Sequence, residues 1–144
     1  MSKTNVARTV GRVILGAFLV FTGVAHLTFA RAEFRAQVPP WVPLDIDVVV
    51  VVSGVVEVAL GVALLVARRH RRLVGIATAL FFVAVFPGNI AQWLEHRDAF
   101  GLDTDTARFV RLFFQPVLIA LALWSTWIPR RGCRPAREEP GAAS

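Results

Sequence analysis

The chain has 144 residues, of which 56% are hydrophobic and 18% are charged, and its formal charge is +6. In an ordinary soluble domain about a quarter of the residues are charged, so this fraction is low. Together with a mean hydropathy of +0.59 it favours a single membrane domain. The basic residues stand in short clusters beside apolar runs, which argues for lipid headgroups and against nucleic acid as a partner. Cys133 is the single cysteine, which excludes thiol oxidases that use cysteine pairs.

Four continuous apolar runs predict four transmembrane helices, since a helix needs about 20 residues to cross the hydrocarbon layer. The runs lack the polar stripes of a soluble bundle, and their continuity favours helices over a barrel. We therefore predict an all-α polytopic membrane protein whose four-helix transmembrane domain covers residues 10–129, with spans at 10–29, 46–67, 73–94 and 109–128. Residues 1–9 are predicted to form a cytoplasmic N-terminus and residues 130–144 a disordered cytoplasmic tail.

The first run also resembles a signal peptide, because basic residues precede it and Ala30-x-Ala32 follows it. We expect it to be retained, since it is long and contains His26. The segment ARAEFRAQV (30–38) is amphipathic and is predicted to lie along the outer surface, where the prolines of PPWVP (39–43) end it.

Local signals predict the helix ends and the close contacts. Asp45 or Asp47 can cap the second span, and the fourth can be capped by Asp103, Thr104, Asp105 or Thr106. Pro87 and Pro116 predict kinks, of which Pro-Gly-Asn at 87–89 is the sharper candidate. Glycines are predicted to let helices approach closely in lipid, at positions 11, 16, 23, 54 and 61.

The arginines predict the orientation of the spans. Eleven of the sixteen basic residues fall on one side when both termini are placed together, and the other side holds most of the acids. The positive-inside rule then puts both termini in the cytoplasm (N-in, C-in). Fifteen arginines against one lysine is typical of a bacterium with a GC-rich genome, so the predicted location is the bacterial plasma (inner) membrane.

Glu57 is the most unusual residue, because it lies about ten residues from either end of its span. An ionised acid there costs a few kcal/mol unless it is protonated or has a partner. The outer half of each other span offers polar groups, and we predict one polar pocket, open to the outer side, from His26, Glu57, Asn89, Gln92, Arg111 and Gln115. Arg108 is expected on the same side as Arg111 and Gln115.

The alternative is purely structural. Arg111 and His26 would then reach the interface, the two amides would satisfy the carbonyl that Pro87 frees, and Glu57 would be a neutral contact between helices. The sequence contains no metal-ligand pair, haem ligand pair or phosphate loop, so no intrinsic cofactor is expected. A carboxylate, an imidazole and amides can instead hydrogen-bond the head of a quinone or a lipid.

Five stretches resemble the DoxX family of small bacterial four-helix membrane proteins: GAFLVFTGVAHL (16–27), VPPWVP (38–43), SGVVEVALGVALL (53–65), VFPGNI (85–90) and RLFFQP (111–116). The resemblance as a whole covers about residues 10–128. The resemblance implies that His26, Glu57, Asn89, Arg111 and Gln115 occupy the polar positions of that family, and that the protein is associated with membrane redox or oxidative-stress assemblies.

We therefore expect a membrane subunit of such an assembly, with a quinone-like or lipid molecule in the pocket and with no independent catalytic activity. Any activity would be that of a quinone-linked oxidoreductase subunit. Expected partners are the lipid bilayer, membrane or peripheral redox proteins, and a second copy of the chain. The alternatives are a non-catalytic membrane scaffold and, less favoured because the inner halves of the spans are apolar, a small proton-coupled transporter.

Overall fold

A computed structural model describes residues 2–99, 101 and 103–127 of the chain. Every regular element in these residues is a helix. In chain order they are α1 (Lys3–Leu27), α2 (Arg31–Arg35), α3 (Ile46–Val66), α4 (Arg71–Leu94), α5 (Asp105–Leu112) and α6 (Phe114–Thr126). The all-α prediction is confirmed, whereas the expected tail at 130–144 lies outside the described residues.

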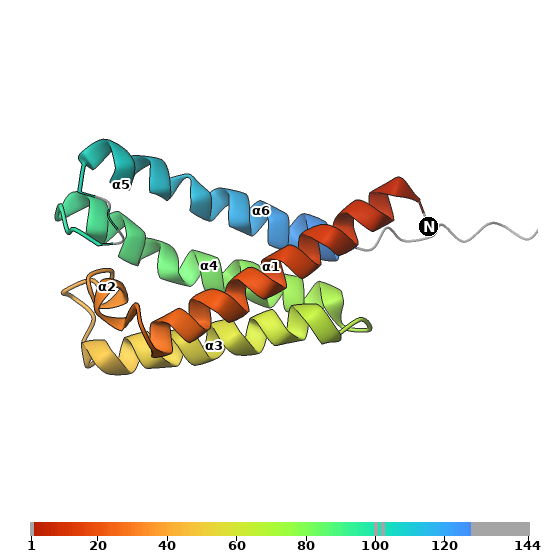
Figure 1. The fold of residues 1–144 in the computed structure, drawn as a ribbon, viewed down its shortest axis with the longest axis horizontal. Helices are drawn as coiled ribbons and strands as arrows, with labels where there is room; N and C mark the ends of the chain where they lie inside the picture. The colour runs from red at the N-terminus through yellow and green to blue at the C-terminus, as the bar shows by residue number, and fades with distance from the viewer. Residues whose placement is uncertain (1, 100, 102, 128–144) are drawn as a thin grey trace, which may run out of the picture.

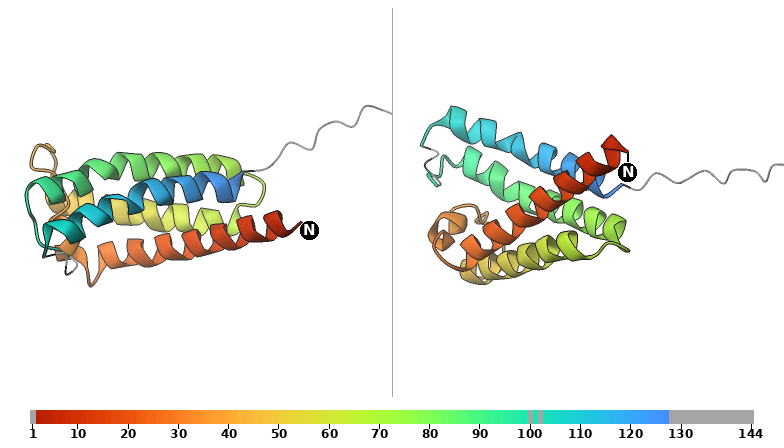
Figure 2. Two further views of the ribbon diagram at one scale, coloured as in Figure 1. Left: turned by 90° about the horizontal axis from the view of Figure 1, so that it is seen from above. Right: turned by 45° about the vertical axis from the view of Figure 1, so that its right-hand side comes forward.

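Four long rods run side by side in the bundle, with α5 and α6 following one another as a single rod (Figure 1). The start of α1, the turn between α3 and α4 and the end of α6 share one end of the bundle, which we call the basic end (Figure 2). The short helix α2 and helix α5 lie at the opposite end, which we call the pocket end. The most extensive helix contact joins α1 to α3, and the next joins α4 to α6.

Four segments are long and apolar enough to cross a membrane: Lys3–Leu27, Ile46–Val66, Arg71–Leu94 and Asp105–Thr126. Only 22–39% of the residues in each span are buried inside the protein, so most of this apolar surface faces outward. Outward side chains include large hydrophobic residues on every span, such as Phe21, Val52, Leu80 and Val117. In water such a surface would be unstable, and in lipid it is the expected exterior, so the chain is a multi-pass membrane protein.

Paired glycines hold α1 against α3. The Cβ of an alanine at Gly61 would lie 2.7 Å from the carbonyl oxygen of Gly16, and one at Gly23 would lie 2.7 Å from that of Gly54. The spacing of seven residues on both helices brings two such pairs onto one antiparallel interface. The predicted role of these glycines in close packing is confirmed, and it fixes the position of α1 beside Glu57.

The helix ends follow the predicted signals in part. Asp45 caps α3 by accepting from the backbone N–H groups of Asp47 and Val48, and Thr104 caps α5. α1 begins at Lys3 rather than at residue 10, because Ser2 accepts from the N–H of Asn5 and starts the helix early.

The two prolines differ in their effect on the continuity of their helices. α4 runs without interruption through Pro87, whereas the fourth span is divided at Phe113, three residues before Pro116. The ring of Pro116 cannot fit against the carbonyl one turn earlier, and the N–H of Phe113 bonds to Val110 in a tighter turn instead. The helix is thus interrupted near Pro116 and continuous at Pro-Gly-Asn, and the kink at Pro87 stays a prediction.

A small apolar core closes the bundle between its two ends. It consists of Leu15, Leu19, Leu64, Ala79, Phe82 and Ala122, which come from all four rods. Large side chains such as Leu19 and Phe82 meet small ones such as Ala79 and Ala122 in this layer. Above it, towards the pocket end, the helices separate around a cavity.

Candidate functional site

His26 and Glu57 form one side of the site, where the last turn of α1 lies against the middle of α3. The imidazole Nδ1 lies 2.9 Å from the carboxylate Oε2, and both side chains are about nine-tenths buried. The same Nδ1 lies 2.9 Å from the carbonyl oxygen of Thr22, one turn earlier on α1. One N–H cannot point at both acceptors, and the contact with Glu57 has the distance of an ion pair without the angle of a hydrogen bond.

Glu57 Oε2 is consequently a buried oxygen with no hydrogen-bond donor. A buried polar atom in this state costs about 1–3 kcal/mol, and more when it is charged. The rest of the structure supplies the carboxylate with an imidazole neighbour but leaves room for a further donor. This is the observation that favours a ligand over a purely structural contact between helices.

Asn89 and Gln115 form a second polar group on the opposite side of the cavity. Asn89 Nδ2 donates to Gln115 Oε1 over 3.0 Å, and Gln115 Nε2 donates to the carbonyl of Phe82 over 2.8 Å. Pro87 has no N–H, so the carbonyl four residues before it has no helical donor. The carbonyl of Phe82 belongs to the residue just before that one. Three groups from two helices thus hold each other, and they fix both amides at the wall of the cavity.

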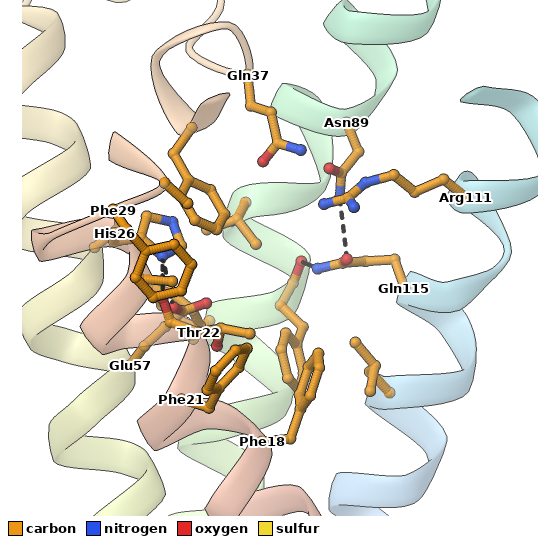
Figure 3. A pocket seen from close by; sticks show the side chains of 18 residues that line it. Phe18, Phe21, Thr22, His26, Phe29, Gln37, Glu57, Asn89, Arg111 and Gln115 are labelled. Carbon is orange, nitrogen blue, oxygen red and sulfur yellow. Dashed lines mark hydrogen bonds and ion pairs between the residues drawn. The ribbon is translucent and has the colours of Figure 1, made fainter. Parts of the chain in front are cut away.

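A cavity of about 340 Å³ lies between these two polar groups (Figure 3). Its polar lining includes Thr22, His26, Glu57, Asn89, Arg111 and Gln115, and its apolar lining includes six phenylalanines, at positions 18, 21, 29, 34, 81 and 82. In Figure 3 the side chain of Arg111 extends from α5 towards Asn89, while His26 and Glu57 lie across the cavity from them. The volume is within the range of small-molecule sites.

An adjoining cavity of about 510 Å³ extends along α5 and α6. It shares Phe18, Asn89, Arg111 and Gln115 with the first cavity and adds apolar side chains of the fourth span, including Val110 and Phe114. Both of these added side chains are exposed on the outside of the protein. The polar pocket therefore continues towards the lipid-facing surface on the side of α1, α5 and α6.

The segment at 30–38 was expected to lie along the outer surface, but part of it enters the bundle. Phe34 of α2 stacks on His26 with ring centroids 3.3 Å apart and an interplanar angle of 17°. Both Phe34 and Val38 are buried, and Gln37 lines the cavity. The segment forms a cover over the pocket, because its apolar side faces inward and the prolines that follow turn the chain back to α3.

Gln92 is the one predicted site residue that does not line the cavity. Its side chain is 2% exposed, accepts from Gln37 Nε2 over 3.1 Å and donates to the carbonyl of Arg97. It therefore supports the cover segment from behind. Gln92 follows Asn89 by three residues, so the two side chains are about 60° apart around the axis of α4. This rotation is enough to point Gln92 out of the pocket.

Arg108 also differs from the expectation that it would project with Arg111. It is 5% exposed and contacts the carboxylates of Asp98 and Asp105, and its Nε donates to the carbonyl of Arg97. The side chain holds the loop between α4 and α5 rather than the pocket. The sequence has three acidic residues in this loop. From them one could have predicted that Arg108 pairs with the loop rather than with the pocket.

The predicted site thus divides into lining and supporting residues. Five of the six predicted residues line one cavity, and sequence reasoning missed Phe34 and Gln37 as parts of it. Among residues 2–99, 101 and 103–127, no three His, Cys, Asp or Glu side chains gather as metal ligands would.

The fold and the site define a class: a small four-helix membrane protein with a buried polar cavity that opens towards lipid. The chain belongs to the family described as "Domain of unknown function (DUF8561)", whose model matches residues 15–126. This range includes every residue that lines the polar cavity. No curated protein and no solved structure matches the chain. The resemblance to the DoxX family stays a prediction.

Proposed function

We propose that the protein binds a small amphipathic molecule with a quinone-like or lipid head in the cavity between His26, Glu57 and Asn89. We further propose that it serves as a membrane subunit of a redox or oxidative-stress assembly in the bacterial plasma membrane. The observation that carries the first part is Glu57 Oε2, a buried oxygen without a donor that faces a cavity of ligand size.

The chemistry of the lining supports a flat head with polar atoms at two edges. Amide and guanidinium groups from α4, α5 and α6 stand on one side, and the imidazole and carboxylate stand on the other (Figure 3). Quinone carbonyls accept hydrogen bonds from amide and guanidinium donors, and a hydroxyl of a quinol or a lipid can donate to the carboxylate. Phenylalanine rings between the two sides suit the faces of a ring.

The shape of the opening supports an apolar tail. The cavity continues along α5 and α6 towards exposed hydrophobic side chains, so a tail could lie in lipid while the head stays between the helices. Membrane quinones and lipids both have this division into a polar head and a long apolar chain. The chain itself needs only to bind this molecule, and a partner protein would supply any electron transfer.

The proposed orientation and partners rest on the charges and on the DoxX resemblance. The arginines of the basic end have no acidic neighbour among the residues that the structure describes, which suits a cytoplasmic surface with anionic lipids. The pocket would then open in the outer half of the membrane. The association with a redox assembly comes from the resemblance alone.

A binding experiment with a matched control tests the cavity. Wild-type protein, Glu57→Gln and Glu95→Gln are extracted gently and analysed by native mass spectrometry, then titrated with decylubiquinone. Glu95 lies outside the cavity, so its variant makes the same acid-to-amide change without touching the site. We expect a small molecule to co-purify with the wild type and with Glu95→Gln, and to be lost from Glu57→Gln. The affinity for decylubiquinone should fall about tenfold in Glu57→Gln and stay unchanged in Glu95→Gln.

Equal binding by all three proteins, or none by any, would contradict a ligand role for Glu57. If partner polypeptides then stay bound to Glu57→Gln as they do to the wild type, the protein is a membrane scaffold and the carboxylate is structural.

A further inference from the structure

The basic end of the bundle contains an arginine that is buried inside the protein. Arg12 lies in the first half of α1 and is only 7% exposed. Its Nη1 donates to the carbonyl of Leu64, close to the end of α3. A guanidinium has five N–H donors, and one carbonyl leaves this buried cation without a counter-charge.

More arginines surround Arg12. Arg8 lies one turn earlier on the same face of α1, and the positive charges of Arg71 and Arg68 act on Arg12 from the turn between α3 and α4. Arg8 has two buried nitrogens, Nε and Nη1, that make no hydrogen bond, and Arg71 has a buried Nε in the same condition. Four like charges therefore gather here, and three of their buried nitrogens make no hydrogen bond.

No carboxylate balances these charges within the described residues. At the pocket end, by contrast, Arg31, Arg35, Arg97 and Arg108 each contact an aspartate or a glutamate. Surface arginines can remain hydrated, but the buried Arg12 loses water and gains one carbonyl without a counter-charge. The contrast between the two ends indicates that an anion from outside the described chain belongs at the basic end.

The start of α4 adds donors of its own. Arg71 is the first residue of this helix, and the preceding His70 makes no side-chain cap, so the first backbone N–H groups lack a side-chain acceptor. The positive end of the helix dipole points to the same place. A tetrahedral oxyanion with several acceptor oxygens matches both sets of donors better than a single carboxylate does.

We propose that Arg8, Arg12, Arg68 and Arg71 form a specific binding site for a phosphate group at the basic end. The phosphate can come from the headgroup of an anionic phospholipid or from a soluble phosphate compound, and the shared chemistry is a phosphate oxyanion between guanidinium groups and the start of α4. The site is separate from the cavity, because the apolar core around Leu15 and Leu64 lies between them.

The test compares arginines inside and outside the cluster. Full-length wild type, Arg8→Gln, Arg71→Gln and Arg69→Gln are purified in detergent. Arg69 lies in the same turn but is exposed, so its variant removes the same charge without removing a buried donor. Arg12 is left intact, since its loss could prevent folding. Bound lipid is counted by native mass spectrometry with phosphatidylglycerol and with phosphatidylcholine of the same acyl chains. Thermal unfolding is measured with inorganic phosphate against chloride at equal ionic strength.

We expect phosphatidylglycerol to be retained in preference to phosphatidylcholine, with about a tenfold loss of affinity in Arg8→Gln and Arg71→Gln and none in Arg69→Gln. Stabilisation by inorganic phosphate without lipid preference, lost in the same two variants, would assign the site to a soluble phosphate compound. The proposal is overturned if neither phosphate source binds in preference to its control. It is also overturned if Arg69→Gln weakens binding as much as Arg8→Gln does, because binding would then follow total charge alone.

Discussion

Replacing Gly23 by alanine tests the contact on which the pocket depends. Gly23 faces α3, and a Cβ added there would lie 2.7 Å from the carbonyl oxygen of Gly54 and 2.7 Å from Cγ2 of Val58. The backbone nitrogen of Val58 would be 2.8 Å away. Two of these three atoms belong to the backbone, so no side-chain rotation can make room and the helices themselves must separate.

The distances give the size of the effect. Ordinary contact begins at about 3.4 Å, so α1 has to move by about 0.7 Å from α3. The contact between His26 and Glu57 lies one turn away on the same interface, and its 2.9 Å would lengthen to about 3.6 Å. Overpacking costs about 1–3 kcal/mol, while the change from glycine to alanine in a helix returns about 0.5–1 kcal/mol. We expect a net loss of about 1–2 kcal/mol in the free energy of unfolding.

Gly11→Ala is the matched control, since its nearest neighbours are the side-chain atoms Leu121 Cδ1 and Trp124 Cζ3, each at 3.3 Å. These side chains can shift by a few tenths of an ångström, so this variant should be as stable as the wild type or slightly more stable. Unfolding by titration with a denaturing detergent, followed by circular dichroism, measures both. Equal stability of Gly23→Ala and Gly11→Ala would show that α1 and α3 do not approach as closely as described.

Three further substitutions test other parts of the structure. Phe34→Ala removes the ring that stacks on His26, which should lower the free energy of unfolding by about 3 kcal/mol. A carbodiimide should then label the Glu57 carboxylate more readily, and unchanged labelling would contradict the role of Phe34 as a cover. Gly75→Ala places a Cβ against Thr126 and should destabilise the protein, with recovery in the double variant that also has Thr126→Gly, which removes all three clashing atoms; additive losses would refute the clash. Arg108→Gln removes a buried donor to two carboxylates and should cost about 2–4 kcal/mol in the same titration, without changing decylubiquinone affinity.

The sequence predicted the four spans because their signal is local and strong. A run of about twenty apolar residues has one stable form in lipid, and the caps Asp45 and Thr104 follow from short-range hydrogen bonding. The start of α1 was harder to place, because residues 3–9 are polar and helical structure there depends on the cap at Ser2 and on packing at the basic end. The break at Phe113 depends on which of two prolines the neighbouring helices accommodate, which is a tertiary property.

The site was predictable to the extent that buried polar residues in a membrane must find one another. Glu57 and Asn89 lie on different helices, and the cost of leaving either alone in lipid favours a shared pocket. The sequence does not show which face of α4 points into the cavity. For this reason it could not tell that Asn89 lines the cavity whereas Gln92 does not. The cover by Phe34 could not be read in advance, because a short amphipathic segment suits the membrane surface and a protein groove equally well.

The arrangement of the bundle favours binding over transport. The glycine pairs hold α1 tightly to α3, and the cavity opens towards lipid on the side of α1, α5 and α6, where its lining reaches exposed apolar residues. Below the cavity, the apolar core layer that contains Leu19, Phe82 and Ala122 is buried and separates the cavity from the basic end. A molecule that enters beside Glu57 would meet this layer before it could reach the basic end. A transporter needs a route through the layer, and the cavities around Glu57 do not extend to the arginines of the basic end.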